Sequence, residues 1–234
     1  LVILEKQYKS IINKETFELD AIVDEIKLAN REVVCVLTSM DEPLGKAVGN
    51  NLEVKEAIHF LKGDMPQDLK EVVLELGAYM IKLAGLGENL EENKKQMLEN
   101  IQNGKAFNKL KQMVQNQGGD ISYLENTDKF EKAQFTEEIL ASQNGYIQEI
   151  NAEEIGKVAC NLGAGRIKKE DNIDYAVGIE LDKKVGTKVQ KGEILGKIHA
   201  NDTTKLELAK KQVNDIIKIS PEYCEKIQTI IEKI

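Results

Sequence analysis

The hydrophobic pattern of this 234-residue chain changes character near residue 120. Before that point, apolar residues recur at helical spacing over long stretches, which is typical of amphipathic helices. After it, the apolar runs are short and glycines separate them, which indicates short strands and turns. The pattern therefore predicts an α/β partial layer, a mixed sheet flanked by helices, followed by a small α+β barrel-sandwich-like C-terminal domain.

The first part combines one strand signal with several helix signals. The β-branched run at 33–37 lacks polar alternation, so it predicts a strand covered on both faces. Asn50 and Asn51 can cap the helix after this strand, and Asp68 with Glu71 is expected to cap the next one. Helices are expected from Glu15, from Leu52 to Gly63, from Asp68 to Gly85, and over Leu90–Asn103 and Lys105–Gln117.

The second part begins with a hairpin signal, because Asn144-Gly145 separates two β-branched runs. Asn151 is expected to cap a short helix that runs through Leu162. A helix is expected from Thr204, and a terminal helix after Pro221. Strands are expected at Phe135–Leu140, at Tyr146–Ile150, at Tyr175–Leu181, and twice within Val185–Gly196.

The composition narrows the classes of function. The net charge of −8, the absence of Trp and the 5% aromatic content argue against a nucleic-acid partner. No apolar run approaches the length of about 20 residues that a membrane helix requires. Three cysteines far apart, without a CxxC motif, favour reduced thiols in the cytoplasm.

Familiar catalytic motifs are absent from the sequence. It contains no GxGxxG, GxxxxGK[ST], GxSxG or HExxH pattern. The two histidines, His59 and His199, lack a Ser, Cys or carboxylate partner that the sequence makes evident, and we favour structural roles for both. No catalytic residue is therefore assigned.

The most informative segment is the loop 41–51, which leaves an apolar strand and enters a helix. Ligand sites collect at such points in open α/β sheets. Pro43 stiffens this loop, and its glycines let the backbone turn. One interpretation is a capped helix with solvated glutamates. The other is a cation site, in which loop carbonyl oxygens and a helix carboxylate hold a large monovalent ion.

Several long motifs, in one order, carry a family resemblance. The stretch 38–58, TSMDEPLGKAVGNNLEVKEAI, resembles bacterial pyrimidine-nucleoside and thymidine phosphorylases. The segments 162–166, 173–179 and 185–200 are similar to the C-terminal domain of the same family. The resemblance extends from about Glu18 to Ile219.

This resemblance implies a pentosyltransferase of pyrimidine salvage. The family's reaction is reversible phosphorolysis, in which inorganic phosphate attacks the anomeric carbon of a pyrimidine nucleoside and releases the base and a pentose 1-phosphate. The resemblance also implies a potassium ion, held here by the backbone carbonyls of Leu44 and Ala47 and by the side chain of Glu56. It further implies a cytoplasmic homodimer when the enzyme is complete.

The resemblance also implies a division of the chain. Residues 1–120 correspond to the C-terminal part of the α/β glycosyltransferase domain, 121–133 to a linker, and 134–234 to the phosphorylase C-terminal domain with terminal helices. The family's phosphate-binding, base-binding and catalytic residues precede the matched stretch, and residues 1–14 match nothing in the family. We therefore expect a C-terminal fragment, or the product of a disrupted reading frame, that is inactive alone.

Two alternatives belong to other classes of function. The Val185–Leu195 pattern also occurs in biotinyl and lipoyl carrier domains, which attach their cofactor to a lysine at a hairpin tip. Lys183 and Lys184 precede the pattern rather than dividing it. The second alternative is a non-catalytic interaction module that docks through the helices of 68–117.

Overall fold

The computed structural model describes residues 2–6, 28, 32–166 and 168–234. The helix expected from Glu15 lies outside these residues. None of the helices in the described part is long and apolar enough to cross a membrane. The described helices are α2 (Asn50–Leu61), α3 (Gln67–Leu83), α4 (Leu90–Gln102), α5 (Lys105–Asn116), α6 (Ser122–Glu125), α7 (Ala152–Ala159) and α8 (Thr203–Ile216).

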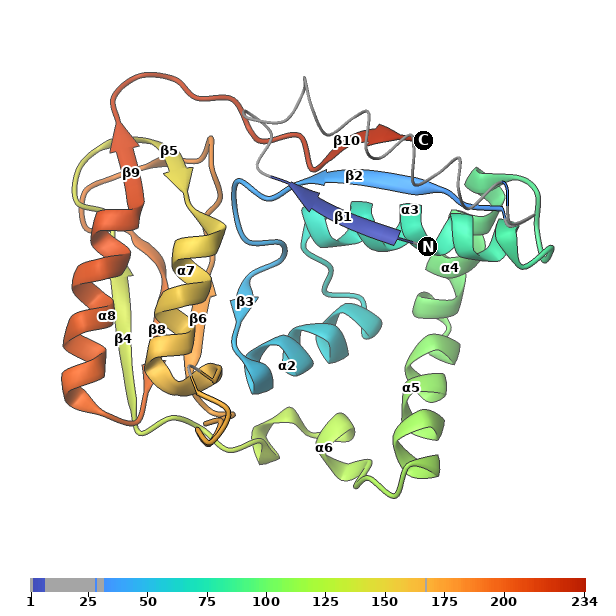
Figure 1. Cartoon of the computed structure of the whole chain (residues 1–234), viewed down its shortest axis with the longest axis horizontal. Coiled ribbons are helices and arrows are strands. Elements are labelled where there is room, and N and C mark those ends of the chain that lie inside the picture. Colours follow the sequence, from blue (N-terminus) through green and yellow to red (C-terminus); the bar gives the residue numbers. More distant parts are fainter. Residues whose placement is uncertain (1, 7–27, 29–31, 167) are drawn as a thin grey trace.

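A three-stranded mixed sheet lies along one side of the molecule (Figure 1). The strand expected at 33–37 begins two residues later. Its consecutive residues Cys35 and Val36 are both buried. Because successive side chains of a strand point to opposite faces, both faces of this strand are covered, as predicted. The sheet order is β1 (Val2–Lys6), β2 (Cys35–Ser39) and β10 (Ile230–Lys233), with β1 parallel and β10 antiparallel to β2.

The C-terminal segment differs from the prediction. The expected helix after Pro221 is wrong, because β9 (Ile217–Ser220) precedes this proline and β10 follows it. Ile217 and Ile219 alternate with polar residues and pair with β5 (Gly145–Ile150), so a sheet partner decides the conformation of this segment. The chain end consequently returns to the first sheet.

Two antiparallel sheets form the second part of the molecule. The first has the order β3 (Ala47–Val48), β6 (Gly178–Leu181), β8 (Ile194–Ala200) and β4 (Phe135–Leu140). The second has the order β7 (Lys188–Val189), β5 and β9. Both sheets contribute to one buried core together with α7 and α8, and this core includes Ile139, Ile147, Ile155, Ile198 and Val213. The α+β character of the C-terminal region is confirmed, and the barrel-sandwich description stays a prediction.

The hairpin predicted around Asn144-Gly145 is wrong. Strand β4 pairs with β8, whereas β5 pairs with β7 and β9 in the other sheet. The Asn144 side chain accepts a hydrogen bond from the Lys191 N–H at 2.7 Å. A Cβ at Gly145 would lie 2.2 Å from the Ser220 carbonyl oxygen, so the glycine permits a close approach of two backbones. The turn therefore leads from one sheet to the other.

The helices of the first part match their predicted spans to within a few residues. Glu75 on α3 is buried and pairs with Lys94 on α4 at 2.8 Å and with Lys233 on β10 at 2.6 Å. Burial acts to raise the pKa of Glu75, but the two lysines outweigh it and hold the pKa below its ordinary value. This cluster joins three elements that are distant in the sequence.

Each part of the chain contributes a strand to a sheet of the other part. Strand β3, which lies early in the sequence, pairs with β6 of the second part, and β10 pairs with β2 of the first. The segment 121–133, expected as a linker, contains α6 and a short 3-10 turn, η2 (Thr127–Lys129). A π-type turn, η3 (Cys160–Ala164), continues α7. The loop after β2 therefore lies where both parts meet.

Candidate functional site

The loop between β2 and α2 brings together two of the three predicted ligand residues. Glu56, on α2, accepts a hydrogen bond from the Lys46 N–H at 2.6 Å through Oε1, and Oε2 lies 3.4 Å from the Ala47 nitrogen. Leu44, the third predicted ligand residue, lies on the bend just before Gly45 and is 43% exposed, and it is not among the residues that line the cavity of Ala47 and Glu56. The helix carboxylate thus points back onto the loop.

Gly45 allows this approach. Its φ of +67° lies in the left-handed region, and a Cβ there would be 2.6 Å from Oε2 of Glu56. A side chain at this position would therefore suffer both backbone strain and a clash with the carboxylate. The glycine lets the loop wrap closely around Glu56.

Strand pairing directs the Ala47 carbonyl to the same side as Glu56. The Lys46 carbonyl accepts a hydrogen bond from the Leu181 N–H of β6 at 2.8 Å. Carbonyls of successive strand residues point to opposite edges, so the Ala47 carbonyl points away from β6. The N–H of Ala47 points toward Glu56, and the N–H and C=O of one strand residue share an edge. The carbonyl oxygen of Ala47 and the carboxylate of Glu56 therefore lie at the same edge of β3, the edge that faces away from β6.

A small cavity with both polar and apolar lining residues lies beside these two residues. Its volume is about 200 Å³, and both Ala47 and Glu56 line it. Burial raises the pKa of Glu56, although the N–H groups of Lys46 and Ala47 act in the opposite direction. The two N–H groups thus offset only part of the free-energy cost of burying the ionised carboxylate, and a bound cation would offset more of this cost. Carbonyl and carboxylate oxygens are ligands that hard cations prefer, so the residues present fit a cation.

The described residues do not form a many-carboxylate metal site. Among them, no three His, Cys, Asp or Glu side chains are grouped so as to hold a metal ion. The donor set of the loop is instead one carboxylate and backbone carbonyls. Weak, carbonyl-rich sets of this kind suit large monovalent ions.

Lys184 and Val185 also hold the loop, and the sequence did not single them out as loop partners. Lys184 donates a hydrogen bond to the Pro43 carbonyl and pairs with Asp68 at 2.9 Å. Glu42 accepts a hydrogen bond from the Val185 N–H at 2.8 Å. These partners are 141 and 143 positions apart from the loop residues in the sequence, so no local pattern indicates them.

Asp68 does not cap α3, which corrects the prediction. The N-cap position is Pro66, without a side-chain hydrogen bond, and Asp68 lies inside the first turn. Its carboxylate accepts a hydrogen bond from the Gly45 N–H at 3.0 Å. Burial acts to raise the pKa of Asp68, but the hydrogen bond and charge of Lys184 outweigh it, so this pKa is lowered.

The expected asparagine cap of α2 is also wrong. The N-cap position is Gly49, and no side chain caps it. The Asn50 amide donates to the Ala164 carbonyl at 2.7 Å, and the Asn51 amide donates to the Glu131 carbonyl at 3.3 Å. Both side chains thus tie the start of α2 to distant segments.

The side-chain hydrogen bonds found for the two histidines go to residues outside the loop, although His59 lines the same cavity as Ala47 and Glu56. His59 is exposed on α2, with Nε2 3.5 Å from the Thr127 hydroxyl. His199, on β8, has Nε2 2.7 Å from the Glu180 carboxylate on the neighbouring β6, a partner that the sequence did not reveal. This cross-strand pair is consistent with a structural role for His199.

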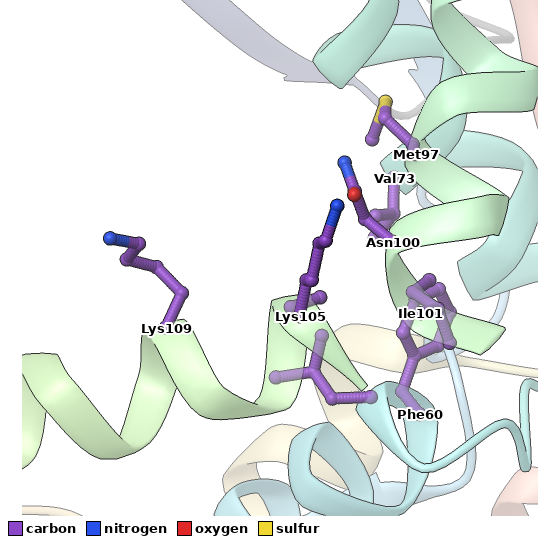
Figure 2. A pocket seen from close by; sticks show the side chains of 9 residues that line it. Phe60, Val73, Met97, Asn100, Ile101, Lys105 and Lys109 are labelled. Carbon is purple, nitrogen blue, oxygen red and sulfur yellow. The ribbon is translucent and has the colours of Figure 1, made fainter. Parts of the chain in front are cut away.

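A separate groove lies among α2, α3, α4 and α5 (Figure 2). Its volume is about 360 Å³. Figure 2 shows Lys109 extending away from the apolar residues Phe60, Val73 and Ile101. The groove offers mainly apolar packing surface, and its lining carries two lysines but no carboxylate or histidine. It is lined by Phe60, Leu61, Val73, Met97, Asn100, Ile101, Lys105, Ala106 and Lys109.

Two family models match separate parts of the chain. Residues 15–107 match the glycosyl transferase family a/b domain, and residues 146–220 match the pyrimidine nucleoside phosphorylase C-terminal domain. The chain is thus a protein of the glycosyltransferase α/β class that carries this C-terminal domain.

Comparison with curated relatives gives the family. The chain is 43% identical over 188 residues to the pyrimidine-nucleoside phosphorylases of Staphylococcus aureus strains USA300, COL and N315. The chain belongs to the pyrimidine-nucleoside phosphorylase family. The match covers 80% of this chain and 42% of each relative, so the chain spans about two fifths of the length of the curated relatives it matches.

Proposed function

We propose that this chain supplies the C-terminal, cation-holding portion of a pyrimidine-nucleoside phosphorylase. The reaction is reversible phosphorolysis of a pyrimidine nucleoside to the free base and a pentose 1-phosphate. The observation that carries the proposal is the return of the Glu56 carboxylate to the loop at Gly45–Ala47, within a chain that matches the family on both sides of this loop.

The cation of this site is proposed to be potassium. The carbonyls of Leu44 and Ala47 and the carboxylate of Glu56 hold it, and the shared edge of Ala47 and Glu56 supports this assignment. When bound, potassium supplies a positive charge that these oxygens surround. The chain's own contribution is to present the oxygens on a loop already shaped by Gly45, Asp68 and Lys184.

The partners of the complete enzyme are proposed to be inorganic phosphate, pyrimidine nucleosides and a second copy of the enzyme. The family resemblance implies that the phosphate and base sites lie in the portion of the relatives that precedes the matched stretch. We therefore expect no turnover from this chain alone. A cytoplasmic location is proposed as well, and the free thiols of Cys35, Cys160 and Cys224 are consistent with it.

A chimera tests the function. Residues 38–219 of this chain would replace the matching segment of the Staphylococcus aureus relative, and release of uracil or thymine from uridine or thymidine would be followed in phosphate buffer. We expect turnover in the ordinary enzyme range of roughly 1–10³ s⁻¹ for the chimera, and none for this chain by itself. A folded chimera that releases no base would overturn the proposal, and base release by this chain alone would overturn the expected inactivity.

The carrier alternative finds little support in the lysines. Lys183 pairs with Glu193 at 2.8 Å, and Lys184 pairs with Asp68 at 2.9 Å. A carrier lysine stands free at a hairpin tip to receive its cofactor, whereas both of these ammonium groups are engaged. An intact mass that includes a biotinyl or lipoyl adduct would revive this alternative.

A further inference from the structure

Residues 221–234 run from the end of β9, in the second part of the chain, back to β10 in the first sheet (Figure 1). Apolar side chains anchor this segment in both parts. Cys224 and Ile227 pack against the core of the second part, whereas Ile230 is buried with Val36 of β2 in the first. The segment is therefore held by two separate groups of buried residues.

The end of this segment holds the strand from which the loop departs. The Cys35 N–H donates to the Ile234 carbonyl at 2.8 Å, and the Ile234 N–H donates to the Cys35 carbonyl at 2.9 Å. At the other end of β2, the Ser39 N–H donates to the Thr229 carbonyl at 2.9 Å. Ser39 is the last residue of β2, and the loop to α2 begins at the next residue. Both ends of β2 are thus fixed by the C-terminal segment.

An ion pair adds to this attachment. Lys233 on β10 pairs at 2.6 Å with Glu75 on α3, whose side chain is buried. Lys94 on α4 pairs with the same carboxylate, so the cluster attaches β10 to two helices of the first part. Release of β10 would leave the buried carboxylate with Lys94 alone, and loss of a partner from a buried charge is costly.

Further ties between the two parts of the chain lie within the loop itself. The Pro43 carbonyl accepts a hydrogen bond from Lys184, and the Lys46 carbonyl accepts one from the Leu181 N–H at 2.8 Å. While β10 is attached, the loop shares with the C-terminal segment the work of holding the two parts together. When β10 is detached, movement of the second part acts directly on these loop contacts.

β10 has the features of an element that opens locally. It has four residues, lies at one edge of the described sheet, and exposes Glu232 and Lys233. Edge elements with few buried side chains open at a lower free energy than the core does. Such an opening removes the acceptors of the Cys35 and Ser39 N–H groups and leaves the pairing of β4 with β8 in the second part intact.

We propose that residues 221–234 form a strap that ties the two parts of the chain together and positions the end of β2, so that the loop keeps its contacts with β6 only while β10 is paired. Release of β10 frees the Ser39 N–H, and the contact of the loop with Leu181 then opens more often. The strap acts on the loop through β2, so it is a positioning element. This inference rests on hydrogen bonds and packing, and it stands or falls independently of the proposed potassium site.

Hydrogen exchange of individual amides in the full chain tests the strap. Ile230→Ala removes the buried anchor of β10, and we expect the Ser39 and Leu181 amides to exchange about tenfold faster or more. Ser39 reports the opening of β10 itself, whereas Leu181 reports the contact between the loop and β6. The Ala141 amide, which donates a hydrogen bond within the second part, should keep its wild-type rate and serves as the internal reference.

Ile231→Ala is the matched control, because it removes the same atoms from the neighbouring, half-buried residue of the same strand. All three amides should keep their wild-type rates in this variant. Acceleration at Leu181 as large as that in Ile230→Ala would show that the buried anchor has no special role, and it would overturn the proposal.

The pattern of rates in Ile230→Ala decides between a strap and a general loss of stability. Faster exchange at Ser39 and Leu181 with an unchanged Ala141 supports the strap. An unchanged rate at Leu181 shows that β10 does not position the loop, and equal acceleration of all three amides shows a general loss of stability; either result overturns the proposal. If Ile230→Ala does not fold, Lys233→Gln takes its place, and an unchanged rate at Leu181 in that variant overturns the proposal.

Discussion

The carboxylate of Glu56 closes over Gly45 so tightly that a Cβ on this glycine would lie 2.6 Å from Oε2. One helical residue and one loop residue are thereby fixed against each other. The Lys46 and Ala47 N–H groups point to the same carboxylate, so the loop takes its shape around Glu56. The contact makes the glycine, the carboxylate and the candidate cation site one structural unit.

Gly45→Ala should therefore destabilise the chain by more than backbone strain alone. A residue with a side chain in the left-handed region costs about 1–3 kcal/mol, and the clash with Glu56 adds to this. Gly85→Ala is the matched control, because Gly85 has a φ of +68° and no atom within 4 Å of an added Cβ. Urea unfolding measures both losses of free energy. Equal losses in the two variants would show that the contact with Glu56 does not constrain the loop.

Glu56→Ala should remove the potassium dependence of stability. Loss of a ligand at a sheltered site is expected to lower the unfolding free energy in potassium by roughly 1–3 kcal/mol. Glu53→Ala is the control on the same helix, since Glu53 is exposed and its Oε1 lies 3.4 Å from the Gly49 nitrogen. Thermal unfolding in potassium against tetramethylammonium compares them. The same loss in both variants, or no potassium effect in the wild type, would leave Glu56 as an ordinary helix residue.

The Glu180–His199 pair should stabilise the second part of the chain in a pH-dependent way. The hydrogen bond from His199 holds the pKa of Glu180 below its ordinary value of 4.5, although burial acts against it. A lowered folded-state pKa contributes stability that is present above the unfolded value and is lost as the pH falls through the folded value. Urea unfolding between neutral pH and pH 3 should thus show an acid loss of stability that is smaller in Glu180→Gln.

Glu138→Gln is the control for this pH dependence. Glu138 is exposed on the neighbouring strand β4, so its substitution removes one carboxylate without removing the pair. We expect its acid loss of stability to match that of the wild type. If Glu180→Gln loses as much unfolding free energy on acidification as the wild type does, the contact with His199 contributes nothing to stability.

Local signals along the sequence were sufficient for much of the fold. Asn151 caps its helix as expected, with its side chain accepting from the Glu154 N–H at 3.0 Å, because a cap needs only residues three positions apart. Helical periodicity likewise located α2 to α5, and the run at 33–37 located β2 to within two residues. The same local reading, aided by the family resemblance, selected Glu56 as the carboxylate that turns back to the loop.

Tertiary contacts decided the rest. Asp68 has the sequence context of a helix cap, but the Gly45 N–H and the Lys184 ammonium compete for its carboxylate and engage it instead. Ile217 and Ile219 follow a helix and become a strand because β5 offers them backbone partners and a buried face. Hydrophobic periodicity reports only local spacing, so it does not indicate hydrogen-bond partners that lie more than a hundred residues apart. The sequence by itself therefore determined helices α2 to α5 and the place of the loop, and the family resemblance selected its carboxylate. Only the tertiary structure decided which charges surround that carboxylate.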